Sequence, residues 1–366
     1  MRLRIKGAGL PGRDAISASP LSMSRSIYGA IALALSIGAV TVAGARSPDI
    51  VVGGGIAALL KPFARPANIP APADNPVTEA KAALGKALFF DPRLSGSGAI
   101  ACASCHNPSL GWQDGQVRGV GHHGAPLGRH TPTILNIAWA EPLFWDGRAD
   151  TLEEQAKGPL SAPAEMNMPA GDAVAKVRSI PGYRAAFGAA FPGQPIDLDT
   201  IAKAIATYER TVISGTAPFD RWVRGDDKAV SEPAKRGFAL FNSTRTGCAS
   251  CHSGWRFTDD GFHDIGLPDG DIGRARIVPG IAILEHAFKT PTLRNIAERP
   301  PYMHDGSLPT LEAVIDHYDH GYVDRPSLSP EMKRSKLTAQ EKADLVAFLQ
   351  SLSSRDKGVT FPILYR

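Results

Sequence analysis

The chain has 366 residues, and 40 Lys and Arg against 36 Asp and Glu give it a formal net charge of +4. Its 43% apolar and 21% charged residues are ordinary for a globular protein, which excludes a disordered chain and a polytopic membrane protein. The charge excess is too small, and too scattered, for a nucleic-acid-binding surface. The length predicts two domains.

The first feature along the chain is an apolar run of 16 residues, Ile27–Val42, with Arg25 before it and Ala43-Gly44-Ala45 after it. A basic flank, a short apolar stretch and small residues at the exit are typical of a secretory signal peptide. We therefore expect a signal peptide over residues 1–45, export to a bacterial periplasm, and no stable membrane insertion after its removal. An uncleaved anchor stays open as the alternative, although the run is short for a spanning helix.

All four cysteines fall in two copies of one pentapeptide, Cys102-Ala-Ser-Cys105-His106 and Cys248-Ala-Ser-Cys251-His252. The pattern C-x-x-C-H is the attachment signature of c-type haem, in which two thiols bind the haem covalently and the histidine binds the iron. A zinc site would need its cysteine pairs about 15–20 residues apart, whereas 143 residue positions (248 − 105) separate these. The sequence thus predicts two covalently bound c-type haems.

The chain also contains an internal duplication. Residues Thr131–Glu153 align without a gap with Thr290–Glu312 at an offset of 159 (290 − 131), and 12 of the 23 positions are identical. Upstream of the cysteines, Gly85–Phe89 resembles Gly237–Phe241. The chain is therefore two copies of one haem module.

These observations divide the chain into a flexible lead-in over residues 46–75, an N-terminal haem domain over 76–228 and a C-terminal haem domain over 229–366. Repeated prolines and the run Gly53-Gly54-Gly55 favour mobility in the lead-in.

The predicted fold class is mainly α, with long loops and little sheet. Leu198, Ile201, Ile205, Tyr208 and Val212 form the stripe of an amphipathic helix. A second helix is expected after Thr338, which forms a capping box with Glu341 and is followed by Leu345, Phe348, Leu349 and Leu352 on one face.

The duplication allows the two iron sites to be compared position by position. Leu311, Val314, Ile315 and Tyr318 share one helix face, so Tyr318 is a candidate sixth ligand of the second iron. The equivalent position in the first copy (318 − 159) is Pro159, which has no donor atom. One iron would then be closed and the other open to a small oxidant. A buried phenol in the core is the alternative interpretation of Tyr318.

Peroxide cleavage needs a group that moves a proton and a polar contact for developing charge. Gln155 lies four residues before Pro159 on the same face, and Glu165 follows in a loop. Trp145, which aligns with His304, could relay charge between the haems. The alternatives are a solvated carboxylate at Glu165 and core packing of Trp145. His122, in a Gly-His-His-Gly loop, could occupy the open iron at rest or lie in solvent.

Over roughly Asn75–Leu352 the chain resembles the bacterial di-haem cytochrome c peroxidase/MauG family. The resemblance rests on both pentapeptides and on three further motifs: Phe144-Trp-Asp-Gly-Arg-Ala149, Glu165-Met-Asn-Met-Pro169 and Pro301-Tyr-Met-His-Asp-Gly306.

The resemblance implies that His106 and His252 are proximal ligands, that Gln155, Pro159 and Glu165 form the peroxide pocket, and that Trp145 lies between the haems. A tyrosine at position 318 is typical of the MauG-like branch, in which peroxide oxidises both haems and an aromatic residue of a partner protein is then oxidised.

Three positions depart from the pattern of that branch. Thr246 replaces the tryptophan that passes oxidising equivalents to the surface. His130 replaces a calcium-binding asparagine, although backbone carbonyls at Arg299 and Pro301 would complete a Ca²⁺ site. His122 aligns with the resting-state ligand of the ordinary peroxidases.

The sequence thus predicts a periplasmic peroxidase that uses H₂O₂ to oxidise an aromatic residue, expected to be tryptophan, of a partner protein. The nearest alternative detoxifies H₂O₂ with electrons from a small cytochrome. A non-catalytic di-haem electron carrier is the alternative from another class.

Overall fold

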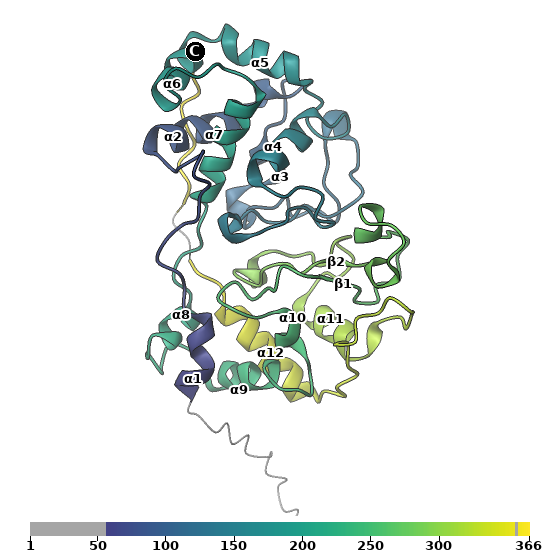
Figure 1. Ribbon diagram of the computed structural model, residues 1–366. Coiled ribbons are helices and arrows are strands. Elements are labelled where there is room, and N and C mark those ends of the chain that lie inside the picture. The colour runs from purple at the N-terminus through teal and green to yellow at the C-terminus, as the bar shows by residue number, and fades with distance from the viewer. Residues whose placement is uncertain (1–55, 356–357) are drawn as a thin grey trace, which may run out of the picture. The chain divides into compact units, whose positions relative to one another are not determined.

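The computed structural model describes residues 56–355 and 358–366 (Figure 1). The predicted signal peptide, residues 1–45, lies outside the described residues, as does the lead-in up to residue 55. Among the helices of the described segments, none has both the length and the apolar character needed to cross a membrane.

The described part is mainly helical, which confirms the predicted fold class. Its first half contains α1 (Ile56–Leu60), α2 (Glu79–Phe89), α3 (Cys102–Cys105), α4 (Leu152–Ser161), α5 (Ala170–Ser179), α6 (Pro181–Ala190) and α7 (Leu198–Arg210). Its second half contains α8 (Pro218–Val223), α9 (Glu232–Phe241), α10 (Cys248–Cys251), β1 (Phe262–His263), β2 (Phe288–Lys289), α11 (Leu311–Asp316) and α12 (Ala339–Ser351). The two short strands pair antiparallel, with Phe262 opposite Lys289.

Each haem module is built on a pair of packed helices, α2 against α7 and α9 against α12 (Figure 1). Glycine permits the close approach in both pairs. A Cβ added at Gly85 would lie 1.9 Å from the carbonyl oxygen of Ala204, and one added at Gly237 would lie 1.9 Å from that of Asp344. The two modules therefore repeat the same helix crossing, as the duplication predicts.

The predicted helices begin where their capping residues stand. Thr338 is the N-cap of α12, and the Glu341 carboxylate accepts the Thr338 backbone N–H at 2.8 Å, which completes the predicted capping box. In the duplicated segment, Thr151 caps α4 and Thr310 caps α11, each by accepting an N–H from the third residue of the helix. The two copies therefore start this helix in the same way.

A separate apolar core lies inside each module. In the first, Leu84, Leu88, Phe89, Val177, Tyr183 and Ile201 are almost fully buried. In the second, Phe219, Phe238, Phe257, Phe348 and Leu352 form an aromatic-rich core. The cysteine-bearing helices α3 and α10 pack beside these two cores through Cys102 and Cys248.

The two ends of the described chain each pack on the module that is more distant in sequence. Phe63, 4% exposed, lies in the second core and stacks on Phe257 with ring centroids 4.8 Å apart. At the other end, the Gly182 N–H donates to the Arg366 carbonyl at 2.8 Å, and Tyr365 packs on Tyr183. In Figure 1 the C-terminus accordingly lies beside α6, and α1 lies beside α9. The described part of the expected lead-in is thus packed, because its apolar residues complete a core.

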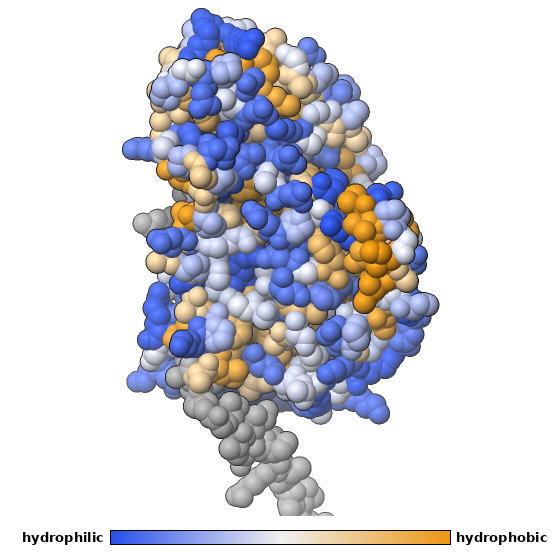
Figure 2. All heavy atoms as spheres, viewed as in Figure 1, coloured by the Kyte–Doolittle hydropathy of each residue, from blue (hydrophilic) through white to orange (hydrophobic). Residues whose placement is uncertain are grey.

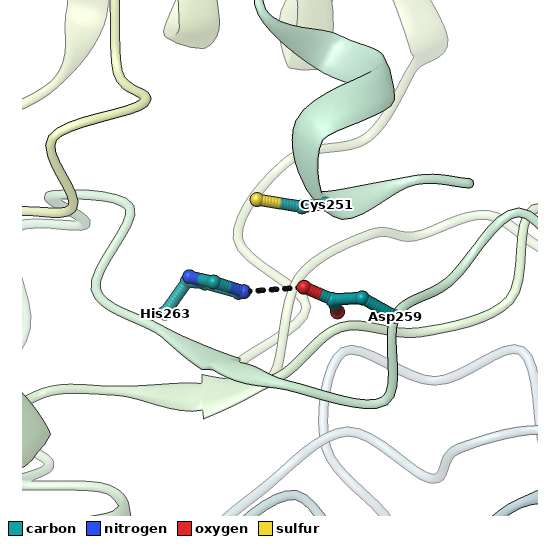
Figure 3. Close-up of side chains that lie close together, drawn as sticks. All are labelled: Cys251, Asp259 and His263. Carbon is teal, nitrogen blue, oxygen red and sulfur yellow. Dashed lines mark hydrogen bonds and ion pairs between the residues drawn. The ribbon is translucent and has the colours of Figure 1, made fainter.

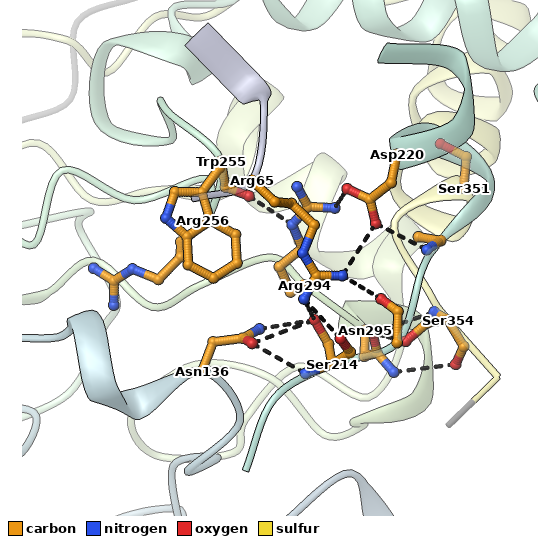
Figure 4. A network of polar contacts seen from close by, with 12 residues as sticks. Arg65, Asn136, Ser214, Asp220, Trp255, Arg256, Arg294, Asn295, Ser351 and Ser354 are labelled. Atoms are coloured by element: carbon orange, nitrogen blue, oxygen red, sulfur yellow. Dashed lines mark hydrogen bonds and ion pairs between the residues drawn. The ribbon is translucent and has the colours of Figure 1, made fainter. Parts of the chain in front are cut away.

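A polar network around Arg65 joins the modules: its guanidinium donates to the Ser214 carbonyl at 2.6 Å and forms an ion pair with Asp220 of α8 at 3.5 Å (Figure 4). The Asn136 amide donates to the Ser214 hydroxyl at 3.0 Å and accepts the Ser214 N–H at 3.0 Å. Asn295 and Ser354 repeat this pairing in the second module. Between the pairs, the buried guanidinium of Arg294 bonds to Asp220 at 2.8 Å.

Candidate active site

A cavity of about 840 Å³ lies in the described part of the chain. Both pentapeptides line it, with the side chains of Cys102, Cys105, His106, Cys248, Cys251 and His252. The cavity continues from one module into the other. It therefore brings the two predicted haem sites together in one space.

Both motif histidines are oriented by the backbone that follows them. The Nδ1 of His106 donates to the Trp112 carbonyl at 3.2 Å, and the Nδ1 of His252 donates to the Phe257 carbonyl at 2.9 Å. Burial lowers the pKa of both imidazoles, so each is neutral. A neutral imidazole with Nδ1 held by a carbonyl presents Nε2 to a metal. The two motifs therefore fit the two haems.

The first module supplies Gln155, Pro159 and Glu165 to the cavity. Gln155 and Pro159 lie four residues apart on α4, so both face the same side, as predicted. The loop with Glu165 lies beside α3, because the Met166 sulfur is 3.9 Å from the Cys102 sulfur.

Glu165 is half-buried, and its burial raises the pKa of its carboxyl group. The Arg148 guanidinium acts in the opposite direction, but burial dominates. A carboxyl group whose pKa moves toward neutrality is suited to both accepting and returning a proton. This property fits the acid–base role predicted for Glu165.

The second module places Leu311, Val314, Ile315 and Tyr318 on the cavity wall, as the helix face predicted. Tyr318 lies in a single π-helical turn, residues His317–Gly321, that follows α11. Burial raises the pKa of its phenol, and the adjacent Cys251 and Cys248 thiols add to the shift. A phenol held in this position could bind iron.

Trp145 and His304 occupy equivalent positions in the two copies and meet between the modules. Both line the cavity, and their rings pack edge to face. The Trp145 indole N–H donates to the His130 carbonyl at 2.8 Å. His304 stacks on Phe288 with ring centroids 3.4 Å apart. The structure thus brings the predicted relay residue into contact with the other module.

The positions of His122 and Thr246 bear on two further predictions. His122 does not line the cavity, although its neighbour Gly121 does. Its loop is held against the loop of Glu165, because the His122 N–H donates to the Ala164 carbonyl at 3.1 Å. Thr246 lines the cavity and donates its hydroxyl to the Leu240 carbonyl at 2.7 Å.

The residues around His130 do not fit the Ca²⁺ ion that the resemblance implies. Both nitrogens of this buried imidazole are engaged: Nδ1 donates to the Gln116 carbonyl at 2.7 Å, and Nε2 lies 2.9 Å from Oε1 of Gln113. The Gln113 amide in turn donates to the Pro300 carbonyl at 3.0 Å.

Charge and donor chemistry also disfavour this ion. Burial lowers the pKa of His130, and the charge of the Arg299 guanidinium lowers it further, which places a cation close by. Ca²⁺ is bound by oxygen donors, and carboxylates dominate its sites. His130 supplies only nitrogen, so the carbonyls of Arg299 and Pro301 are left without the side-chain ligand expected at position 130.

A second group of metal-binding side chains lies beside the second motif, where Cys251, Asp259 and His263 converge (Figure 3). His263 Nε2 is 2.8 Å from the Asp259 carboxylate, and this bond, with a smaller contribution from Cys251, raises the pKa of His263 to about 10. Once Cys251 forms a haem thioether, it is no longer an anionic ligand. The group is therefore an ion pair beside the haem attachment point.

Glu209 is a cavity residue that the sequence analysis did not single out. It lies on α7 next to Tyr208, and it is 4% exposed. The apolar stripe of α7 does not mark this residue. A comparison of that stripe with the one on α12 would have shown a carboxyl group where the second module has an apolar residue.

Known proteins resemble the chain over most of its length. Residues 79–228 match the family model described as di-haem cytochrome c peroxidase, and residues 234–353 match cytochrome c. The methylamine utilization protein MauG of Methylorubrum extorquens is 53% identical and is aligned over 84% of this chain and 88% of its own length. The cytochrome c551 peroxidase of Pseudomonas aeruginosa is 35% identical over 84% of this chain and 88% of its own. A crystal structure of a MauG-like protein associated with microbial copper homeostasis matches with a TM-score of 0.72, at 35% identity, over 79% of this chain and 94% of that one.

Proposed function

Because the chain belongs to the di-haem cytochrome c peroxidase family, and is thus a two-haem oxidoreductase acting on peroxide, we propose that it uses H₂O₂ to oxidise a tryptophan of a partner protein. We propose the periplasm as the site of this reaction, on the basis of the predicted signal peptide. The proposal follows the MauG-like branch, to which the 53% identical relative belongs.

We assign the N-terminal haem to Cys102 and Cys105, with His106 as its proximal ligand, and the C-terminal haem to Cys248 and Cys251, with His252. When bound, the haems supply the redox chemistry: they accept two oxidising equivalents from H₂O₂ and withdraw two electrons from the partner. The two Nδ1–carbonyl bonds support this assignment, because they hold the imidazoles in the tautomer that binds iron.

Proton movement is the task of the chain's own residues at the first site. Glu165 accepts a proton from the oxygen of H₂O₂ that binds and returns it to the oxygen that leaves as water. The Gln155 amide N–H donates to the charge that develops on the peroxide. With two electrons and two protons from the oxidised partner, one H₂O₂ yields two molecules of water.

The observation that carries the proposal is the difference between the two modules at equivalent positions. Tyr318 lines the cavity in the second module, whereas Pro159 lines it in the first. A phenol that binds the second iron would close that site, and a proline leaves room for peroxide at the first. Trp145 and His304 lie between the two sites and connect them.

An exposed apolar patch supports a protein as the partner. Ile272, Ile277, Ile281 and Ile283 are each at least 40% exposed on the connection between β1 and β2 (Figure 2). Ile277 and its neighbour Arg276 also line the cavity, so the patch adjoins the site. Clustered exposed apolar residues mark protein interaction surfaces. We propose that the partner protein docks on this patch.

The second candidate function is H₂O₂ detoxification with electrons from a small cytochrome. It is favoured by Thr246, which offers no aromatic side chain at the predicted exit point, and by the 35% identity to a cytochrome c551 peroxidase. The third expectation, a non-catalytic electron carrier, does not agree with membership of a peroxidase family.

Two measurements on the holoenzyme separate the two candidates. The first is mass spectrometry of the protein encoded next to this gene, after incubation with holoenzyme and H₂O₂. The second is steady-state oxidation of a reduced small c-type cytochrome. We expect tryptophan oxidation that is lost in Glu165→Gln and slow turnover of the cytochrome. Fast, sustained cytochrome oxidation without modification of the partner would overturn the proposal in favour of detoxification.

A further inference from the structure

Glu209 is a buried carboxyl group on the wall of the cavity. Its side chain is 4% exposed, and its Oε2 atom has no hydrogen-bond partner within the described residues. Burial of a carboxylate without a partner is costly, so such a group is normally neutral or interacts with a ligand. Glu209 therefore needs an explanation that the packing of the protein alone does not give.

The internal duplication shows that this carboxyl group belongs to one module only. Gly85 approaches Ala204 and Tyr208 on α7 in the same way as Gly237 approaches Asp344 and Phe348 on α12. The offset between these helices is thus 140 residues (344 − 204), which places Glu209 at the position of Leu349 (349 − 209).

Leu349 also lines the cavity and is 7% exposed, so the two positions are alike in burial. The first haem site therefore has an acid where the second has an aliphatic side chain. Leucine fills this position in the second module, so packing alone does not require a carboxyl group here.

The charged neighbours of Glu209 leave it unpaired. Arg210, the next residue, forms a two-bond ion pair with Glu153 of α4, at 2.7 and 3.0 Å. Burial raises the pKa of Glu209 to about 8; the charge of Arg210 lowers it and that of Glu153 raises it. On α3, the charge of Glu209 contributes to the raised pKa of Cys102. Glu209 is thus close to the attachment point of the first haem.

Besides the motif cysteines, the other ionisable groups on the first module's part of the cavity wall are His106, Arg129, His130, Asp146, Arg148 and Glu165; Arg129 pairs with Asp146 at 2.7 Å, and both nitrogens of His130 are engaged. His106 is held by the Trp112 carbonyl, and its imidazole is kept neutral by burial. Arg148 bonds to the Asp146 carboxylate at 3.0 Å. His106 and Arg148 are thus engaged, and Glu165 is assigned to proton transfer with H₂O₂, which leaves Glu209 as the carboxyl group of this wall without an assigned role.

We propose that Glu209 is the proton-exchanging residue of the N-terminal haem. In the oxidised state the positive charge of the bound haem would stabilise the Glu209 carboxylate; when one electron from the donor removes that charge, the carboxylate takes up one proton from solvent, and when the electron leaves, the carboxyl group releases it. The charge balance gives the reason: a low-dielectric site favours uptake of a compensating proton over a net change of charge. The inference rests on the proposed attachment of a haem at Cys102, Cys105 and His106.

The test compares Glu209→Gln with Glu154→Gln, which removes an exposed carboxylate of α4, in haem-loaded protein. Spectroelectrochemical titration between pH 6 and 9 reports the potential of the N-terminal haem. Coupling of one proton to one electron lowers a potential by about 59 mV for each tenfold fall in proton activity. We expect this dependence in the wild type and in Glu154→Gln, and a flattened dependence in Glu209→Gln.

A second readout identifies the proton directly. Redox-induced infrared difference spectra should contain a protonated-carboxyl C=O band that Glu209→Gln removes and Glu154→Gln retains. Glu209→Leu copies the second module and serves if the glutamine variant does not fold. An unchanged slope and an unchanged band in a Glu209 variant would overturn the inference.

Failure of the proposed function gives a different result. Peptide mass spectrometry of the same samples reports whether haem is bound to Cys102 and Cys105. A first motif without haem would overturn both proposals. If the haem is bound and reacts with H₂O₂, but its potential depends on pH equally in wild type and Glu209→Gln, only the role of Glu209 is rejected.

Discussion

The indole of Trp145 and the imidazole of His304 lie with ring centroids 6.4 Å apart and planes inclined by 70°. The two residues occupy the same position in the two copies of the duplicated segment, 159 residues apart (304 − 145). Lys289 of β2 fixes this arrangement, because its N–H donates to the Trp145 carbonyl at 2.8 Å. The contact between the modules is therefore made by paired positions of one ancestral motif.

Replacing Trp145 by Phe should slow communication between the haems while both remain bound. The change removes an indole and one hydrogen bond to the His130 carbonyl, which contributes about 1 kcal/mol to stability. Stopped-flow spectra after one equivalent of H₂O₂ should show an unchanged reaction at the first haem and a delayed change at the second. Trp139→Phe, which alters a tryptophan outside the cavity wall, is the control. Simultaneous changes at both haems in Trp145→Phe would contradict the relay.

Tyr318→Phe should change the ligation of the C-terminal haem alone. Without the phenol oxygen, the second iron loses the proposed ligand, so its electron paramagnetic resonance and optical spectra should move to those of an open or differently ligated site. The signals of the first haem should stay as they are. Tyr322→Phe, four residues further along, is a matched control outside the cavity wall. Identical spectra in Tyr318→Phe and wild type would remove the ligand assignment.

Glu165→Gln should lower the second-order rate constant for H₂O₂ by about 10²–10⁴-fold, the usual contribution of a general acid–base group. Burial raises the pKa of Glu165, and only the carboxylate can accept the first proton. The wild-type rate should therefore fall as the pH drops through this raised pKa, and the fall should vanish in Glu165→Gln. The exposed Glu154→Gln is the control. If Glu165→Gln keeps the wild-type rate and pH profile, another residue carries out the proton transfer.

The buried pair of Arg294 and Asp220 should contribute far more to stability than an exposed pair. Its side chains are 1% and 4% exposed, so Asp220→Ala leaves an uncompensated buried charge and should cost about 3–5 kcal/mol. Asp199→Ala breaks a surface pair with Lys157 and should cost less than about 1 kcal/mol. Denaturant unfolding of the two holo-variants measures both. Equal losses would show that Arg294 finds another partner.

Chelation should leave the protein unchanged, because His130 and Arg299 do not fit a Ca²⁺ site. Elemental analysis of protein purified in calcium-containing buffer should find no stoichiometric Ca²⁺, and treatment with a chelator should not alter either haem spectrum. His130→Asn, which restores a side-chain oxygen, tests the same point from the other side. Stoichiometric Ca²⁺ in the wild type, with spectral change on chelation, would show that the residues around His130 do bind this ion.

The sequence predicts what short-range patterns encode. The apolar stripe of Leu198–Val212 and the capping box of Thr338 predict α7 and α12, and both are confirmed because each helix buries its stripe against a partner. The helix face that carries Tyr318 lines the cavity as expected. These features depend on residues three or four positions apart.

Long-range relations were less accessible to the sequence analysis. Glu209 lies between the apolar positions of a stripe, so its burial depends on how α7 meets the cavity. The engagement of both nitrogens of His130 depends on Gln113 and Gln116, which a loop brings back to it. The packing of residues 59–65 was missed because proline and glycine content predicts mobility only where no core accepts the apolar side chains between them.

Each end of the described chain packs on the module that is more distant in sequence, and this limits how the protein can be cut into separate domains. Phe63 completes the core of the C-terminal half, and Tyr365 and Arg366 complete the surface of the N-terminal half. A cut at residue 228 would therefore yield two fragments that each retain the other's missing piece. The duplication is recognisable in the sequence, but neither module has complete packing without residues from the other half. The intact chain is therefore the smallest unit that we expect to fold.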